Sequence, residues 1–359
     1  MTRSTSRVAV FLGVLFVAGL PLASARAMEV ATGSFIGDGT AVRAITGIGF
    51  APEVVIANSA GAGKTALLRS STMAGTMELA ANLPLLVGFI TSLDADGFTV
   101  DGNPKLNDVG VVTHWVAFSE VDDGFAVGTY LGDGAGGGIS VDISDTSSSP
   151  DFQANYLILL PENSEFPIQR FEDGSDTSSS SLGFTGPLVV GSDVTALTPT
   201  GFATTGGART NELNTRYHYV AWRERTGTEV GTYVGSAGLT VSLPFLADFV
   251  SVAKEACCQR SRYRTGAHDV DESSYYRALQ ETDDAIKTFT PSGFVIGTSA
   301  DTSSATTHFF VAFESTTAAP AVPALSAILL AMLALVTGGV GFAAQRGRAS
   351  MRQSDGSAV

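Results

Sequence analysis

Short apolar runs recur along the chain and are separated by segments rich in Gly, Asp and Ser. Three of these runs lie at residues 54–56, 156–160 and 249–252. Each run is too short for a helix and contains β-branched or aromatic residues, which predicts a buried strand. Pairs such as Asp38-Gly39 favour tight turns, because glycine adopts positive φ at little cost. The pattern therefore predicts an all-β fold.

Three sequence signatures recur in the same order along the middle of the chain. The first is Gly-Ser/Thr-aromatic-x-Gly, the second is Gly-Phe followed by small or β-branched residues, and the third is Val-Ala-aromatic. They begin at Gly33, Gly128 and Gly231, at Gly97, Gly201 and Gly293, and at Val116, Val220 and Val311. The distance from the phenylalanine of the second signature to the aromatic residue of the third is 20, 20 and 19 residues. This regular spacing indicates an internal threefold repeat.

The repeats are predicted at residues 29–120, 124–224 and 227–315. Several short strands in about 95 residues are typical of a small antiparallel β-sandwich of the jelly-roll kind. Because a period near 100 residues is much longer than that of a solenoid, each repeat is expected to have its own core and to fold by itself. The alternative is one pseudo-threefold body in which the three repeats share a core.

The N-terminus has the pattern of a secretory signal peptide, predicted at residues 1–27. Arg3 and Arg7 precede an uncharged apolar run at residues 8–22, and the small residues that follow predict cleavage after Ala25 or Ala27. We therefore expect the protein to be exported, to the cell envelope or the extracellular surface.

The C-terminus begins with a linker at residues 316–321 and ends in a predicted membrane tail at residues 322–352. Residues 324–344 carry no charge and are long enough to cross a bilayer as a helix, and Arg346 and Arg348 follow on what should be the cytoplasmic side. Val322-Pro323-Ala324-Leu325-Ser326, the helix and the arginines together resemble the PEP-CTERM and IPTL-CTERM sorting tails of bacteria. That resemblance implies processing by an envelope sorting protease, and the alternative is an ordinary membrane anchor.

The charge and cysteine content exclude some classes of partner. Without the two ends, 15 basic and 34 acidic residues remain, a net charge of −19. Such a chain repels nucleic acid, so no nucleic-acid partner is expected. The two cysteines, Cys257 and Cys258, are adjacent and do not form a disulfide framework, so the cores must be hydrophobic.

One locally basic stretch is the candidate ligand-binding site. Arg260, Arg262 and Arg264 alternate, so in a strand their guanidinium groups would share one face, with Tyr263 beside them. Guanidinium groups suit carboxylate or sulfate groups, which predicts an acidic glycan as ligand. The alternative is a solvated edge strand whose charges prevent aggregation.

No catalytic residue, metal site or cofactor is predicted. The sequence at residues 60–65 resembles a phosphate-binding loop but has Asn58 where that motif needs glycine. His114 and His218 occupy the same position in their repeats, and the third repeat has Phe309 there. A position that accepts phenylalanine is expected to be packed. His268 has no metal-ligand partner at the usual spacings.

The repeats resemble a module of tail-fibre-type phage proteins and of secreted bacterial proteins of unknown role. The matching residues of the first repeat lie at 33–39, 45–56, 92–100 and 114–118. A looser likeness to H-type lectin domains lies in the order of its strands. Both resemblances imply a non-enzymatic binding or structural protein at a bacterial surface or in its matrix. We expect its partners to be extracellular polysaccharide and the membrane. The alternatives are a lectin-like glycan-binding module and a carbohydrate-active enzyme.

Overall fold

The computed structural model describes residues 28–119, 124–143, 152–172, 181–185, 189–190, 193–255, 260–278 and 282–315. The predicted signal peptide, the sorting motif at Val322 and Pro323, the tail helix, Arg346, Arg348 and the two cysteines lie outside these ranges. Within them, no helix has the length and hydropathy that a membrane span requires.

The first repeat, residues 29–119, consists of a five-stranded and a three-stranded sheet. The larger sheet contains, in spatial order, β1 (Glu29–Ile36), β8 (Val112–Ser119), β3 (Val54–Ser59), β4 (Leu67–Ser70) and β5 (Met77–Glu78). The smaller sheet contains β2 (Val42–Thr46), β7 (Gly97–Asp101) and β6 (Ile90–Asp94), and the short helix α1 (Pro104–Asn107) connects the two sheets.

The second and third repeats, residues 125–222 and 228–313, have the same plan with six strands in the larger sheet. In the second repeat these are β14 (Val189–Val190), β13 (Ser181–Gly183), β12 (Ile168–Phe171), β11 (Tyr156–Pro161), β17 (Arg216–Trp222) and β9 (Phe125–Leu131). Its smaller sheet contains β10 (Ser140–Asp142), β16 (Gly201–Thr204) and β15 (Val194–Thr198), and its helix is α2 (Ala208–Asn211).

In the third repeat the larger sheet contains β18 (Thr228–Val234), β26 (Thr307–Phe313), β20 (Phe249–Lys254), β21 (Arg262–Thr265), β22 (Glu272–Tyr275) and β23 (Thr282–Asp283). The smaller sheet contains β19 (Thr240–Ser242), β25 (Gly293–Ile296) and β24 (Ile286–Thr290), and the helix is α3 (Ala300–Ser303). The all-β prediction and the three tandem antiparallel sandwiches are thus confirmed.

The second signature marks the contact between the strands of each smaller sheet. Its glycines begin β7, β16 and β25, and a Cβ at any of them would lie about 2 Å from a backbone carbonyl oxygen of the neighbouring strand. The phenylalanine after each glycine is fully buried and packs edge-on against an aromatic ring of the larger sheet. These ring pairs are Phe98–Trp115, Phe202–Tyr219 and Phe294–Phe310, at centroid distances of 5.6, 5.3 and 5.4 Å. The signature therefore joins the two sheets of each sandwich.

The third signature lies on a strand that is buried on both faces. In β8, Trp115 and Ala117 face the interior of their own sandwich, whereas Val116 and Phe118 face the other two repeats. The same alternation holds in β17 and β26. Each larger sheet thus packs on its own small sheet with one face and on the other repeats with the opposite face.

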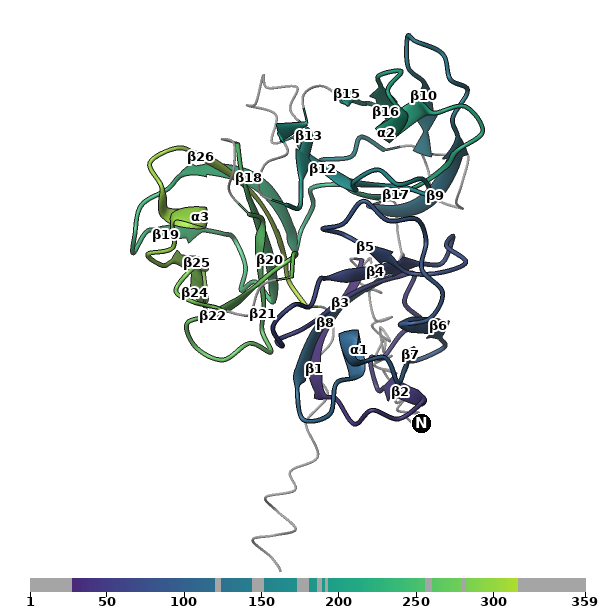
Figure 1. Cartoon of the computed structure of the whole chain (residues 1–359). Coiled ribbons are helices and arrows are strands. Elements are labelled where there is room, and N and C mark those ends of the chain that lie inside the picture. The colour runs from purple at the N-terminus through teal and green to yellow at the C-terminus, as the bar shows by residue number, and fades with distance from the viewer. Residues whose placement is uncertain are drawn as a thin grey trace, which may run out of the picture.

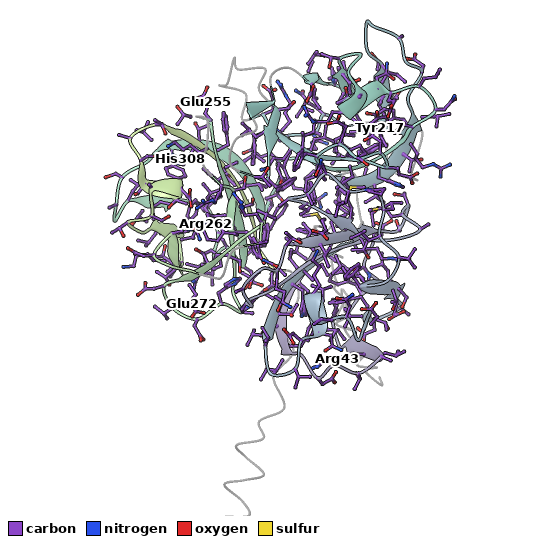
Figure 2. The ribbon with its side chains drawn as sticks, viewed as in Figure 1. Arg43, Tyr217, Glu255, Arg262, Glu272 and His308 are labelled. Carbon is purple, nitrogen blue, oxygen red and sulfur yellow. The ribbon has the colours of Figure 1, made fainter. Side chains whose placement is uncertain are left out.

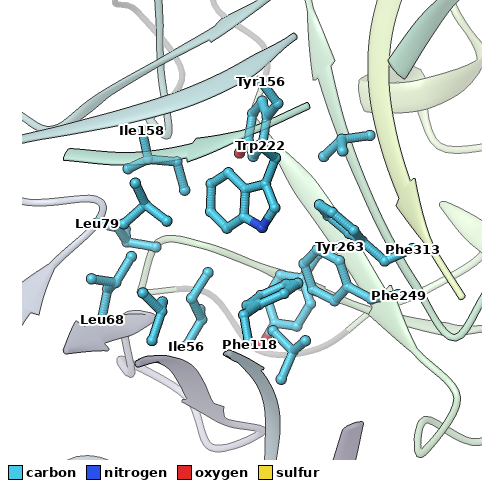
Figure 3. Packing of buried hydrophobic residues seen from close by; sticks show 14 of the residues in the cluster. Ile56, Leu68, Leu79, Phe118, Tyr156, Ile158, Trp222, Phe249, Tyr263 and Phe313 are labelled. Carbon is cyan, nitrogen blue, oxygen red and sulfur yellow. The ribbon is translucent and has the colours of Figure 1, made fainter. Parts of the chain in front are cut away.

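The three repeats surround a shared apolar core, as Figure 1 shows for the ribbon and Figure 3 for the side chains. The closing aromatic residues of the third signature, Phe118, Trp222 and Phe313, meet there. Their ring centroids lie 5.3 Å (Phe118–Trp222), 5.0 Å (Phe118–Phe313) and 5.8 Å (Trp222–Phe313) apart. Each sandwich also has an apolar interior of its own. The structure therefore combines the two alternatives that the sequence left open.

The three junctions between repeats are equivalent: the strand with the third signature in one repeat contacts the fourth strand of the larger sheet, or the segment after it, in another repeat. Strand β8 of repeat 1 contacts β21 of repeat 3, and β26 of repeat 3 contacts β12 of repeat 2. Strand β17 of repeat 2 meets the segment after β4 of repeat 1, where His218 Nδ1 and Thr72 Oγ1 are 3.0 Å apart. Each junction is therefore head-to-tail, and three of them close a ring. The two ends of the described body meet where Ser315 Oγ donates a hydrogen bond to the Val30 carbonyl (3.1 Å).

Candidate functional site

The predicted basic strand is an internal part of repeat 3. Arg262, Tyr263 and Arg264 lie on β21, which pairs with β20 on one side and β22 on the other, and Arg260 precedes this strand. Arg262 and Arg264 are only 1% and 4% exposed, and Tyr263 is buried with them. The alternative of a solvated edge strand is therefore wrong, and Arg262 and Arg264 are not accessible to an acidic glycan. Strand periodicity assigns side chains to two faces but does not say which face water reaches.

The Arg262 guanidinium is held by groups of its own repeat. Its Nε donates to Asp301 Oδ2 (3.2 Å), and its Nη2 donates to the Tyr275 hydroxyl, whose ring lies 3.3 Å below the guanidinium carbon. Burial lowers the pKa of Arg262, while Tyr275 and Asp301 act in the opposite direction. Figure 2 shows Arg262 among the strands of repeat 3. Arg262 thus connects the larger sheet to α3.

Arg264 belongs to a fourth signature that the sequence analysis missed. Arg69, Arg170 and Arg264 occupy the same register, opposite Val55, Leu157 and Val250. In each repeat the arginine Nη1 donates to a carbonyl of one edge strand of the smaller sheet, which is β6, β15 or β24. The acceptors are Ile90 (2.9 Å), Val194 (2.9 Å) and Ile286 (3.5 Å). All three acceptors lie at the β-bulge of that strand, so the arginine joins the two sheets where the ladder is interrupted.

The position of His114 is packed in all three repeats, as predicted. His218 is buried between Thr72 of repeat 1 and Glu162, whose Oε1 lies 2.8 Å from His218 Nε2. Burial lowers the pKa of His218, and the hydrogen bond to Glu162 opposes that shift. In repeat 3, Phe309 stacks on Phe171 of repeat 2 at a centroid distance of 5.7 Å. This position therefore forms the junction with the next repeat in the ring.

At the junction of repeats 1 and 3, His114 stacks on His268. The ring centroids are 3.7 Å apart and the rings are nearly parallel, with an interplanar angle of 13°. The Thr265 backbone N–H donates to His268 Nδ1 (3.1 Å), and His268 Nε2 lies 2.9 Å from Ser274 Oγ. Because Nδ1 accepts a hydrogen bond, the His268 proton belongs on Nε2, where it is donated to Ser274. His268 is thereby fixed in one orientation as the support of His114.

A hollow of about 510 Å³ lies beside His114, between repeats 1 and 3. It is lined by Ser34, Ala60, Gly61, Gly110, Val111, Val112 and His114 of repeat 1 and by Ala267, Asp269 and Glu272 of repeat 3. Asp269 and Glu272 are its charged lining residues, and Figure 2 shows Glu272 at the border of repeat 3. The lining offers carboxylate, hydroxyl and imidazole groups as hydrogen-bond partners. Sequence reasoning missed this site, because its two walls come from segments more than 150 residues apart in the chain.

The loop that resembles a phosphate-binding motif contributes only Ala60 and Gly61 to the hollow. Its Lys64 points elsewhere, because Lys64 Nζ lies 3.1 Å from Asp108 Oδ2 and donates to the Pro104 carbonyl (2.7 Å). Among the described residues, no group of three or more His, Cys, Asp or Glu side chains is arranged to hold a metal ion.

Comparison of the sequence with models of protein families and with curated proteins finds no match. The chemistry of the hollow follows from its lining. Carboxylates such as Asp269 and Glu272 accept hydrogen bonds from hydroxyl and ammonium groups, while Ser34 can both donate and accept. The lining is thus suited to a polar ligand.

Proposed function

We propose that the chain is a non-enzymatic binding or structural protein displayed on a bacterial cell envelope. Its binding site is the hollow between repeats 1 and 3, and its ligand is a carbohydrate of the cell surface or extracellular matrix. Export by the predicted signal peptide and retention by the predicted sorting tail place it there. The sorting protease that acts on that tail and the membrane are its other partners.

The observation that carries this proposal is the hollow at a junction of two repeats. Its volume of about 510 Å³ lies in the range of small-ligand sites, roughly 300 to 1,000 Å³. The walls belong to two sandwiches that pack on one shared core, so the site has rigid supports on both sides. Val30 and Ser315, near the two ends of the described residues, are joined by a hydrogen bond. Both ends of the chain therefore leave the ring at the same place, which suits attachment to a surface through the C-terminal tail.

A carbohydrate-active enzyme is the second candidate, because two carboxylates, Asp269 and Glu272, border the hollow. Glycoside hydrolysis uses a pair of such groups. The two functions are separated by incubating residues 28–315, which include every described strand, with immobilised and soluble polysaccharides. Retention on a polysaccharide without shortening of its chains is the expected result. Chain shortening would instead establish the enzyme.

A variant that fills the hollow tests where the carbohydrate binds. Ala267→Trp places an indole between the two walls and should abolish retention, while circular dichroism remains that of the unchanged protein. Ala305→Trp, the same change at an exposed position of repeat 3 outside the lining, is the matched control and should bind normally. Unchanged retention by a folded Ala267→Trp protein would contradict the hollow as binding site.

A further inference from the structure

The charge of the hollow is opposite to the charge of the binding site that the sequence predicted. The prediction required accessible guanidinium groups for an acidic ligand, but Arg262 and Arg264 are buried. The lining contains no lysine or arginine, and its acidic residues are Asp269 and Glu272. An anionic ligand would be repelled there, whereas a cationic group would be attracted.

Two cations of repeat 3 lie behind this wall, and Arg264 interacts electrostatically with Asp269 and Glu272. Arg264 lies behind Glu272, with Nη1 donating to the Glu272 carbonyl and Nη2 to the His268 carbonyl (3.3 Å). Lys287 is paired with Asp284 (3.3 Å) and with Asp271 (3.7 Å). These cations reduce the negative field of the carboxylates but do not reach the hollow. Asp269 and Glu272 are the acidic residues of the lining, and neither Arg264 nor Lys287 belongs to it.

The opposite wall contains no Lys, Arg, Asp or Glu, and its polar side chains are those of Ser34 and His114. Ser34 and His114 face each other across the β1–β8 ladder and both line the hollow. His114 is held from behind by its stack on His268. A hydroxyl and an imidazole can hydrogen-bond to hydroxyl groups of a ligand. The hollow thus has one wall for a positive group and one wall for hydroxyl groups.

We propose that the hollow recognises a primary ammonium group on a compact, hydroxyl-bearing ligand, which is the chemistry of an amino sugar with a free amine. Asp269 and Glu272 accept hydrogen bonds from the ammonium group, while Ser34 and His114 contact the hydroxyl groups. This inference rests on the proposed binding function of the hollow and specifies its ligand class.

The test is calorimetric titration of residues 28–315 at low salt with glucosamine, N-acetylglucosamine and glucose. Glucosamine should bind at least about tenfold more tightly than the other two sugars, which lack the ammonium group. Added salt should weaken the binding of glucosamine, because charge pairs at a partly exposed site are screened.

Two double variants with equal charge changes show whether the carboxylates recognise the ammonium group. Asp269→Asn with Glu272→Gln should weaken glucosamine binding at least about tenfold. Asp142→Asn with Glu314→Gln changes two exposed carboxylates outside the lining and should bind glucosamine unchanged. Circular dichroism and the melting temperature establish that both proteins are folded.

The results distinguish failure of the hollow as a binding site from failure of the ammonium recognition alone. If all three sugars bind equally and only Ala267→Trp abolishes binding, the hollow is a site but the ammonium recognition is overturned. If glucosamine binding survives Ala267→Trp, the hollow itself fails as the site. If glucosamine does not bind the unchanged protein, the inference is overturned as well.

Discussion

At the residue scale, the arginine that joins the two sheets of each sandwich is a repeated structural element. In repeats 2 and 3 this arginine is buried, and its guanidinium donates to the carbonyl at the β-bulge of the smaller sheet. A hydrogen bond from a charged donor to a buried carbonyl contributes about 1.5 to 3 kcal/mol. Removal of the arginine also leaves that carbonyl without its partner. We therefore regard this arginine as a determinant of sandwich stability.

The first prediction concerns this arginine. Arg170→Met and Arg264→Met should each lower the free energy of unfolding by about 2 to 3 kcal/mol, because the bulge carbonyl loses its donor. The matched control is Arg216→Met on the exposed start of β17, which should change the free energy by less than about 0.5 kcal/mol. Urea denaturation monitored by circular dichroism measures these differences. A change at Arg264 no larger than that at Arg216 would be inconsistent with the bridging role.

The sequence analysis identified the alternation of Arg260, Arg262 and Arg264 but predicted that these side chains are exposed to solvent. Three arginines on one strand resemble a charged surface, and their internal partners come from segments distant in the sequence, such as Asp301 and the carbonyl of Ile286. The equivalent Arg69 and Arg170 were the signal that could have corrected this interpretation. One arginine in the same register of all three repeats indicates a structural role in the repeat.

At the element scale, the signatures correspond to particular strand contacts. The glycine of the second signature lets two strands of the smaller sheet approach closely, and Gly97 and Gly293 also have φ of +147° and +150°. The sequence analysis found this signature by its regular spacing, but it did not predict that the phenylalanine after each glycine is buried between the two sheets. It did not predict α1, α2 or α3, because helices of four residues have no hydrophobic period.

The second prediction concerns this glycine. Gly293→Ala should lower the free energy of unfolding by about 3 kcal/mol or more, because the new Cβ would lie 1.9 Å from the Val241 carbonyl oxygen and φ is unfavourable. Gly136→Ala is the matched control, since nothing lies within 4 Å of its added Cβ. It should change stability by less than about 0.5 kcal/mol. Equal thermal stability of the two variants would rule out close strand approach as the reason for Gly293.

At the scale of the whole molecule, the chain is a ring of three sandwiches around one apolar core. The continuous apolar run at residues 156–160 is typical of a strand buried on both faces. Residues 54–56 and 249–252 occupy the equivalent strands. The sequence identified these runs as buried but could not show that one face belongs to a neighbouring repeat. A repeat removed from the chain would expose Val116 and Phe118 to water, so the structure favours cooperative over independent folding.

The hollow also depends on the closed ring, because Ser34 and His114 of repeat 1 meet Asp269 and Glu272 of repeat 3 only there. No periodicity within either repeat predicts such a junction. The hollow therefore persists only while the ring remains one body in solution.

Differential scanning calorimetry of residues 28–315 shows whether the three repeats unfold as one body. The shared core predicts one unfolding transition whose calorimetric and van't Hoff enthalpies agree. Phe118→Ala should remove about 3 to 5 kcal/mol of stability and shift that single transition as a whole, because its ring contacts Trp222 and Phe313 of the other repeats. Separate transitions for the three repeats, with Phe118→Ala moving only one of them, would contradict the shared core.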